Sequence, residues 1–184
     1  MRVFGFIFFC FTAFTVLFSC GVKTKFNDAE MKWYNSYKFG DTLIFKSDKN
    51  IFDTTYIFKK ELFYPNYNPI ESHGSYLPQW AVVWYKNKNL YFHPEGERLL
   101  AMEKKSPKNN TFITIQYLNS VFFIENIEML HPILNENDRI YELNEFGGKF
   151  KADNPKIIYW HEYFGIVKYI TYDGVAWNRI NMRY

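Results

Sequence analysis

Cysteine is scarce in this sequence: two residues in 184, Cys10 and Cys20. Cys10 lies inside an apolar leader and Cys20 at its end, so the chain after residue 20 has no cysteine. An internal disulfide, a catalytic thiolate and a cysteine-based zinc site are therefore excluded there. We expect the body of the protein to be held together by side-chain packing alone.

Local metal and catalytic motifs are also missing. The four histidines are spaced too widely for an H-x-x-x-H metal motif, and neither G-x-S-x-G nor a Gly-rich phosphate loop occurs. His161 and Glu162 adjoin the expected strand at 157–160, and adjacent residues on a strand face opposite ways. We therefore predict no metal, no cofactor and no catalytic residue. A hydrolase assembled from residues distant in the sequence stays open as an alternative. The histidines are His73, His93, His131 and His161.

Charge of either sign is weak. The formal net charge is +3, and it becomes +2 if Arg2 is removed with the leader. No block of five or six like charges occurs. A nucleic-acid-binding protein would concentrate basic residues on one face, so we expect no nucleic-acid partner.

The leader runs from Val3 to Val22 without a charge, after a basic start at Arg2. Twenty apolar residues are just long enough to span a bilayer, so an uncleaved anchor is one reading. The small residue Ser19 before Cys20 favours the other reading, an export signal over residues 1–19 that is cleaved before Cys20.

The end of the leader, Leu17-Phe18-Ser19-Cys20, resembles the lipobox of bacterial lipoprotein precursors. The resemblance implies a diacylglyceryl group on Cys20, usually with a third acyl chain on its amine, which would hold the protein on a membrane. It further implies a cell-envelope location, for which we favour the periplasmic face of an outer membrane.

The rest of the chain predicts one domain behind a tether. Residues 20–36 read as a lipid-anchored tether with a short helix capped by Asn27 and Glu30. Residues 37–184 read as a single β-rich domain. Strands are expected at 42–47, 54–60, 80–85, 90–93, 98–105, 111–118, 140–143, 157–160, 165–172 and 175–180, while 119–138 fits either a strand or a helix. Asp173-Gly174 predicts a tight hairpin turn with φ > 0 at both positions.

The fold class follows from these hairpin-length connections. We predict a mainly β protein, an antiparallel meander forming a curled sheet, half-barrel or sandwich, with one or two short helices. The C-terminal pattern of aromatic strands and hairpin glycines resembles the endings of small uncharacterised bacterial lipoproteins. It comprises Tyr159-Trp160, 165–169, Asp173-Gly174 and Trp177. It is also faintly similar to half-barrel carriers that shuttle lipoproteins, and neither resemblance implies functional residues.

Aromatic residues make up 22% of the chain. A/T-rich codon usage and core filling account for much of this excess, but aromatic faces also stack on sugars and line apolar pockets. Loops carry binding groups, and the loop over residues 63–79 is the longest in the sequence. We predict a non-enzymatic envelope module that binds a protein, glycan or lipid. The alternatives are an envelope glycan or peptide hydrolase and a lipid or lipoprotein carrier with an apolar half-barrel cavity. The candidate binding residues are Tyr64, Tyr67, His73, Tyr76 and Trp80.

Overall fold

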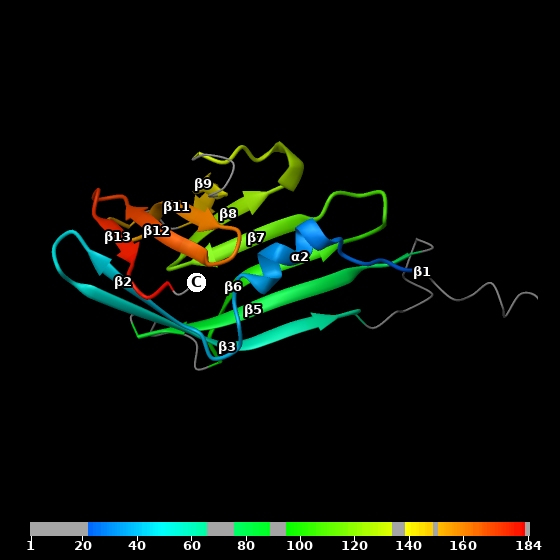
Figure 1. The fold of residues 1–184 in the computed structure, drawn as a ribbon, viewed down its shortest axis with the longest axis horizontal. Helices are drawn as coiled ribbons and strands as arrows, with labels where there is room; N and C mark the ends of the chain where they lie inside the picture. The colour runs from blue at the N-terminus through cyan, green and yellow to red at the C-terminus, as the bar shows by residue number, and fades with distance from the viewer. Residues whose placement is uncertain (1–21, 66–75, 89–94, 134–138, 149–150, 183–184) are drawn as a thin grey trace, which may run out of the picture.

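A single antiparallel sheet dominates the computed structural model, which describes residues 22–65, 76–88, 95–133, 139–148 and 151–182. Its eleven strands lie in the order β10-β8-β7-β6-β5-β3-β2-β13-β12-β11-β9 (Figure 1). The prediction of a mainly β, curled antiparallel sheet is confirmed. The strands are β2 (Thr42–Ser47), β3 (Phe52–Phe63), β5 (Gln79–Asn87), β6 (Glu97–Lys104), β7 (Phe112–Tyr117), β8 (Ser120–Ile124), β9 (Ile140–Asn144), β10 (Gly147–Gly148), β11 (Pro155–His161), β12 (Gly165–Thr171) and β13 (Ala176–Arg179).

The sheet curls until its two edges nearly meet, which makes it barrel-like. β9 pairs with β11 at one edge, and three residues later β10 pairs with β8 at the other. Between them the amide of Glu145 donates to the Lys156 carbonyl (3.0 Å), and the amide of Phe146 donates to the Val121 carbonyl (2.9 Å). The chain itself thus bridges the two edges and leaves little open strand edge there.

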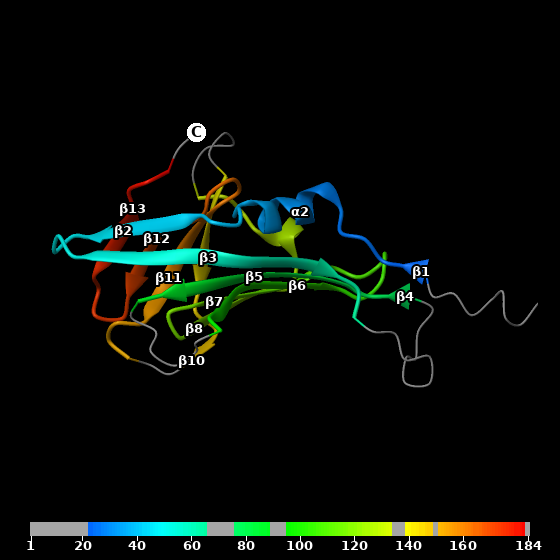
Figure 2. The ribbon, with the colours of Figure 1, turned by 90° about the horizontal axis from the view of Figure 1, so that it is seen from below.

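A small parallel sheet lies at one end of the molecule. β1 (Val22–Lys23) pairs with β4 (Tyr76–Leu77), with Val22 opposite Tyr76 (Figures 1 and 2). Because β4 leads directly into β5, the start of the described chain is held at the end of the sheet where β5 begins.

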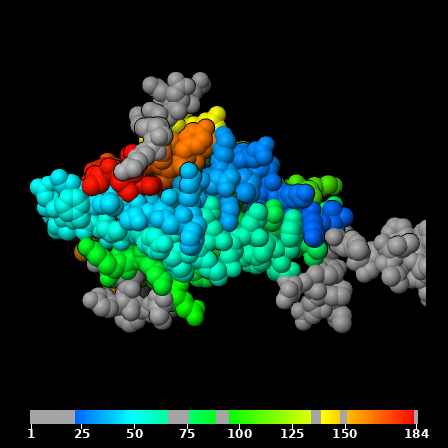
Figure 3. Space-filling model, turned by 60° about the horizontal axis from the view of Figure 1, so that its bottom comes forward, coloured from blue at the N-terminus to red at the C-terminus, as the bar shows by residue number. Residues whose placement is uncertain are grey.

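The helix α2 (Asp28–Asn35) covers the concave side of the sheet near that end (Figure 2). The predicted capping box is present, since Asn27 accepts from the Glu30 amide and Glu30 accepts from the Asn27 amide. Trp33 stacks on Trp160 of β11 at 5.0 Å between ring centroids, and both are buried. In Figure 3 the helix (blue) lies directly against β3 (cyan). The described part of the expected tether, residues 22–36, is therefore packed against the sheet. The buried ring of Trp33 and a buried ion pair between Glu30 and Lys104 of β6 hold it there.

The concave side of the sheet is filled by large side chains. Tyr85, Tyr117 and Tyr169 are fully or almost fully buried, and Tyr117 packs against both other rings at 5.4–5.7 Å. Among them lies a polar network in which the Asn87 amide donates to both carboxylate oxygens of Asp53 at 3.0 Å. Burial raises the pKa of all three tyrosines above the ordinary value. The interior is thus a packed core that includes hydrogen-bonded polar groups.

Two turns differ from the expectation. At Asp173-Gly174 only Gly174 has a positive φ (+82°), so the predicted pair of positive φ angles is wrong. The hydroxyl of Thr171 donates to the Asp173 carboxylate, and this hydrogen bond lowers the pKa of that carboxyl. The two-residue turn with φ > 0 at both positions is instead Leu118-Asn119, at +47° and +68°, which joins β7 to β8. In the described part of the ambiguous stretch, residues 119–133, this turn is followed by strand β8 and then by the short helix η1 (Ile127–Met129).

The expected strand at 90–93 lies outside the described residues. Both edges of β5 are occupied by other strands, with β3 on one side and β6 on the other.

None of the described helices has the length and apolar character needed to cross a bilayer.

Candidate functional site

The predicted binding residues have different surroundings. Tyr64 is half-buried, its hydroxyl donates to the Thr24 carbonyl at 2.9 Å, and Lys23 lies over its ring. Tyr64 therefore fastens the N-terminal segment. Tyr76 is at the edge of exposure in β4 and pairs with Val22. Trp80 is half-buried on the outer face of β5. Cys20, Tyr67 and His73 lie outside the described residues.

Trp80 belongs to a row of aromatic side chains across the outer face of the sheet. The pairing register places Phe63, Trp80, Glu103 and Phe112 side by side on β3, β5, β6 and β7. The ring centroids of Phe63 and Trp80 are 6.4 Å apart and nearly parallel. We call the row formed by Phe63, Trp80, Phe112, Phe123 and Phe146 the outer aromatic row.

The outer aromatic row continues beyond β7. Phe112 contacts Phe123 of β8 at 5.5 Å between centroids, and Phe123 contacts Phe146 at 4.9 Å. Phe146 is 77% exposed, and Phe112 and Phe123 are also exposed. Single exposed apolar residues are normal, but Phe112, Phe123 and Phe146 form a continuous exposed aromatic cluster on the outside of the sheet.

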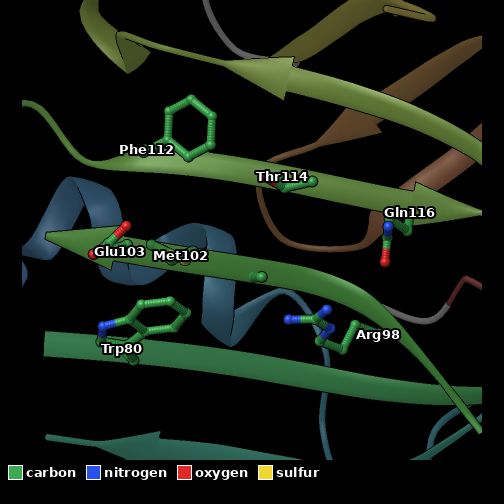
Figure 4. Close-up of a pocket in the computed structure, with 8 residues that line it drawn as sticks. Trp80, Arg98, Met102, Glu103, Phe112, Thr114 and Gln116 are labelled. Carbon is green, nitrogen blue, oxygen red and sulfur yellow. The ribbon is translucent and has the colours of Figure 1, made fainter. Parts of the chain in front are cut away.

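A groove of about 240 Å³ interrupts this row where β6 crosses it (Figure 4). Ala101 forms its floor, because this small residue lies between Val82 of β5 and Thr114 of β7 in the register. Trp80 and Phe112 flank one end of the groove, and Arg98 lies toward the other. A small side chain among large neighbours on one face of a sheet thus creates the hollow.

Four polar side chains line the groove. Arg98, Glu103, Thr114 and Gln116 line it, and within the described residues none of their side chains takes part in a hydrogen bond or an ion pair. One arginine and one glutamate give the lining a formal charge of zero. The groove therefore combines aromatic faces with free donors and acceptors and has no net charge.

The indole nitrogen of Trp80 is itself unsatisfied. Its Nε1 atom is buried and has no hydrogen-bond acceptor in the described part of the chain. A buried donor left in this state costs about 1–3 kcal/mol. Replacing the indole by a ring without an N–H group would remove this cost.

The adjacent residues His161 and Glu162 are engaged in structural contacts. His161 is buried and its Nδ1 accepts from the Tyr163 amide at 3.0 Å. Glu162 is also buried and forms ion pairs with Lys32 of α2 and with Arg139. His131 is exposed, and His93 lies outside the described ranges. Within those ranges no three His, Cys, Asp or Glu side chains gather closely enough to hold a metal ion.

A second hollow lies between the segment after α2 and the C-terminal strands. It has a volume of about 510 Å³ and is lined in part by Lys38, Asp41 and Arg179. Burial lowers the pKa of Arg179, whose guanidinium donates to the Phe164 carbonyl and to Asn181. The Asp41 carboxylate accepts from the Lys38 amide at 2.6 Å. Two of its three charged groups are thus occupied by contacts within the protein.

Comparison with known proteins found no matching family model, no matching curated protein and no matching solved structure. The chemistry of the site itself therefore carries the functional inference.

Sequence reasoning found Trp80 but missed the other residues of the groove. The alternation in β7 was a usable signal, because Phe112, Thr114 and Gln116 face outward while Ile113, Ile115 and Tyr117 are buried. An aromatic residue on the outward side of a half-buried strand indicates a surface role. The pairing that aligns Phe112 with Trp80 depends on the fold. The missed residues are Arg98, Ala101, Met102, Glu103, Phe112, Thr114 and Gln116.

Proposed function

We propose that this protein is a lipid-anchored envelope lipoprotein that acts as a non-enzymatic binding module and recognises its partner on the outer face of its sheet. The observation that carries the proposal is the outer aromatic row with its groove at Trp80. Aromatic side chains and arginine are the residues most enriched at recognition surfaces, and the groove combines both.

The position of the N-terminal segment supports an anchored module. Val22 pairs with Tyr76, four residues before Trp80. Two further residues of chain reach at most about 7 Å, so lipid on Cys20 would hold this end of the sheet at the membrane surface. Two or three acyl chains give stable anchoring, whereas one gives only marginal binding.

The packed interior favours a surface site over the carrier alternative. A carrier needs an apolar cavity inside the sheet, and fully buried side chains such as Phe45, Tyr85 and Tyr117 occupy that space. The structural engagement of His161 and Glu162 likewise favours binding over hydrolysis, since neither is placed to serve as a free acid or base.

The proposal is tested by site-specific photo-crosslinking in intact cells. A photo-reactive residue at Phe123 is compared with one at Phe39, which is 71% exposed and outside the row. We expect adducts with an envelope component at position 123, absent at position 39 and reduced when Cys20→Ser removes the lipid site. Adducts of equal yield at both positions, or none at position 123, would contradict a recognition role for the row.

A further inference from the structure

We propose that the groove at Trp80 binds an uncharged glycan, specifically an extended oligosaccharide of pyranose rings. This rests on the proposed function, because it names the ligand class of the same surface. A pyranose ring has an apolar face of C–H groups and a rim of hydroxyls, so a site for it needs aromatic faces beside free hydrogen-bonding side chains.

The aromatic faces are present and suitably presented. In Figure 4 the ring of Phe112 is seen nearly face-on and that of Trp80 obliquely, with α2 behind the strands. Each residue pairs with Glu103 from a neighbouring strand, so their backbones are about 10 Å apart. Two rings of one oligosaccharide could therefore stack on the two side chains, with Glu103 between them.

The free polar groups match the hydroxyl rim. The Arg98 guanidinium extends along the groove toward Trp80, and Gln116 points from β7 toward β6 (Figure 4). The Arg98 guanidinium offers hydrogen-bond donors in a planar fork, and the Glu103 carboxylate offers acceptors. The Gln116 amide offers both. None of the three side chains has a hydrogen-bond partner in the described part of the chain, so each would gain a bond from a neighbouring ligand hydroxyl.

The charge of the groove distinguishes a glycan from other ligands. Arg98 and Glu103 cancel, which disfavours a nucleic acid or an anionic lipid headgroup. Glu103 also lies in the middle of the row, and insertion of the row into a bilayer would desolvate this carboxylate without a partner. A neutral, polyhydroxylated ligand can form hydrogen bonds to both charged side chains through its hydroxyls and stack its C–H faces on the aromatic rings.

The test is isothermal calorimetry with the full chain in detergent micelles and the β-1,4-linked tetrasaccharide of N-acetylglucosamine as probe. Binding should be saturable, and Trp80→Ala should weaken it about tenfold, the effect of losing one aromatic contact. Trp80→Phe keeps a ring face and removes the unsatisfied N–H, so its affinity should stay within about threefold of the unsubstituted protein. Phe39→Ala, an exposed aromatic outside the groove, is the matched control and should leave binding unchanged.

A second variant guards against misfolding of Trp80→Ala. Ala101→Leu fills the floor of the groove from a surface position and should abolish binding while the circular dichroism spectrum stays that of the parent protein. Absence of saturable binding, or affinities of Ala101→Leu and Trp80→Ala equal to that of the unsubstituted protein, would overturn the glycan assignment. If calorimetry fails while crosslinking at Phe123 still yields a protein adduct, the binding module stands and its partner is a protein. If both fail, the proposed function fails as well.

Discussion

Lys104 of β6 and Glu30 of α2 form a buried ion pair, with the Lys104 Nζ 2.7 Å from Oε1 and 2.8 Å from Oε2 of Glu30. Thr111 donates to the same carboxylate, and so does the amide of Asn27. One glutamate thus caps the helix and fixes it to the sheet.

The first prediction concerns this pair. Glu30→Gln leaves the Lys104 ammonium buried without a counter-charge, and we expect a loss of about 3–5 kcal/mol in the free energy of unfolding. The exposed pair Lys59–Glu61 is the control, and Lys59→Met should change it by less than about 1 kcal/mol. Urea unfolding followed by circular dichroism measures both. Equal small losses would mean that α2 is not held by the buried pair.

A second prediction concerns the close approach at Gly165. Its φ is +68°, and a Cβ there would lie 2.2 Å from Cζ of Tyr37, whose buried hydroxyl accepts from the Ile166 amide. Gly165→Ala must therefore displace a core ring as well as adopt the left-handed conformation. Gly174→Ala meets nothing within 4 Å at a similar φ of +82°.

The two alanine variants separate backbone strain from packing. Gly174→Ala should cost about 1–2 kcal/mol, the left-handed penalty alone. Gly165→Ala should cost about 2–5 kcal/mol, because the overpacking term adds to the same penalty. Thermal unfolding compares them. Indistinguishable midpoints would show that Tyr37 moves aside at no cost.

Much of the fold was predictable because its causes are local. Both ends of the strand Thr42–Ser47 were predicted correctly, because a run of β-branched and aromatic residues is followed directly by turn-forming residues. The Asn27–Glu30 capping box was also visible as a short pattern. The tether prediction missed that Glu30 has a second role, because Lys104 and Thr111 lie 74 and 81 residues away in the sequence.

The candidate site was less predictable for the same reason. Trp80 was identifiable as an aromatic residue beside a long loop, whereas its neighbours Glu103 and Phe112 come from strands whose register depends on the whole sheet. Leu118-Asn119 shows a second limit, because a leucine at φ > 0 is an unusual turn residue and gives no local signal.

The third prediction is an alkaline transition. Burial raises the pKa of Tyr37, Tyr85, Tyr117 and Tyr169 above the ordinary value of 10.0, and the hydrogen bond to Glu145 raises that of Tyr172 to about 12. A raised pKa in the folded state means that folding favours the neutral phenol. The stabilisation is fully present below pH 10 and is lost as the pH rises through the folded-state values.

We therefore expect the buried phenols to ionise together with unfolding at strongly alkaline pH. Tyrosinate absorbance and circular dichroism, recorded on the same sample, should show one coincident transition for this group. Ionisation of all fifteen tyrosines at about pH 10 with an unchanged sheet spectrum would contradict the packed interior.

A fourth prediction concerns the anchor. Cys20→Ser removes the only thiol at the end of the leader, so no thioether-linked lipid can form there. We expect the protein to move from the membrane fraction to the aqueous fraction, and the N-terminal peptide of the unsubstituted protein to carry the diacylglyceryl mass. A Cys20→Ser protein that stays in the membrane with residues 1–19 attached would support the uncleaved anchor instead.

The most direct test of the central claim uses the scarcity of cysteine. With Cys20 lipidated, a cysteine introduced after residue 20 is the only free thiol of the mature chain. Thr114→Cys, which lines the groove and leaves both of its rings in place, and Phe39→Cys are each treated with a membrane-impermeant maleimide that enters the envelope, in intact cells and as purified protein. If the groove in the outer aromatic row is occupied by a ligand, position 114 is protected in cells and labelled after purification, while position 39 is labelled in both. Equal labelling of position 114 in cells and in the purified protein would contradict the account.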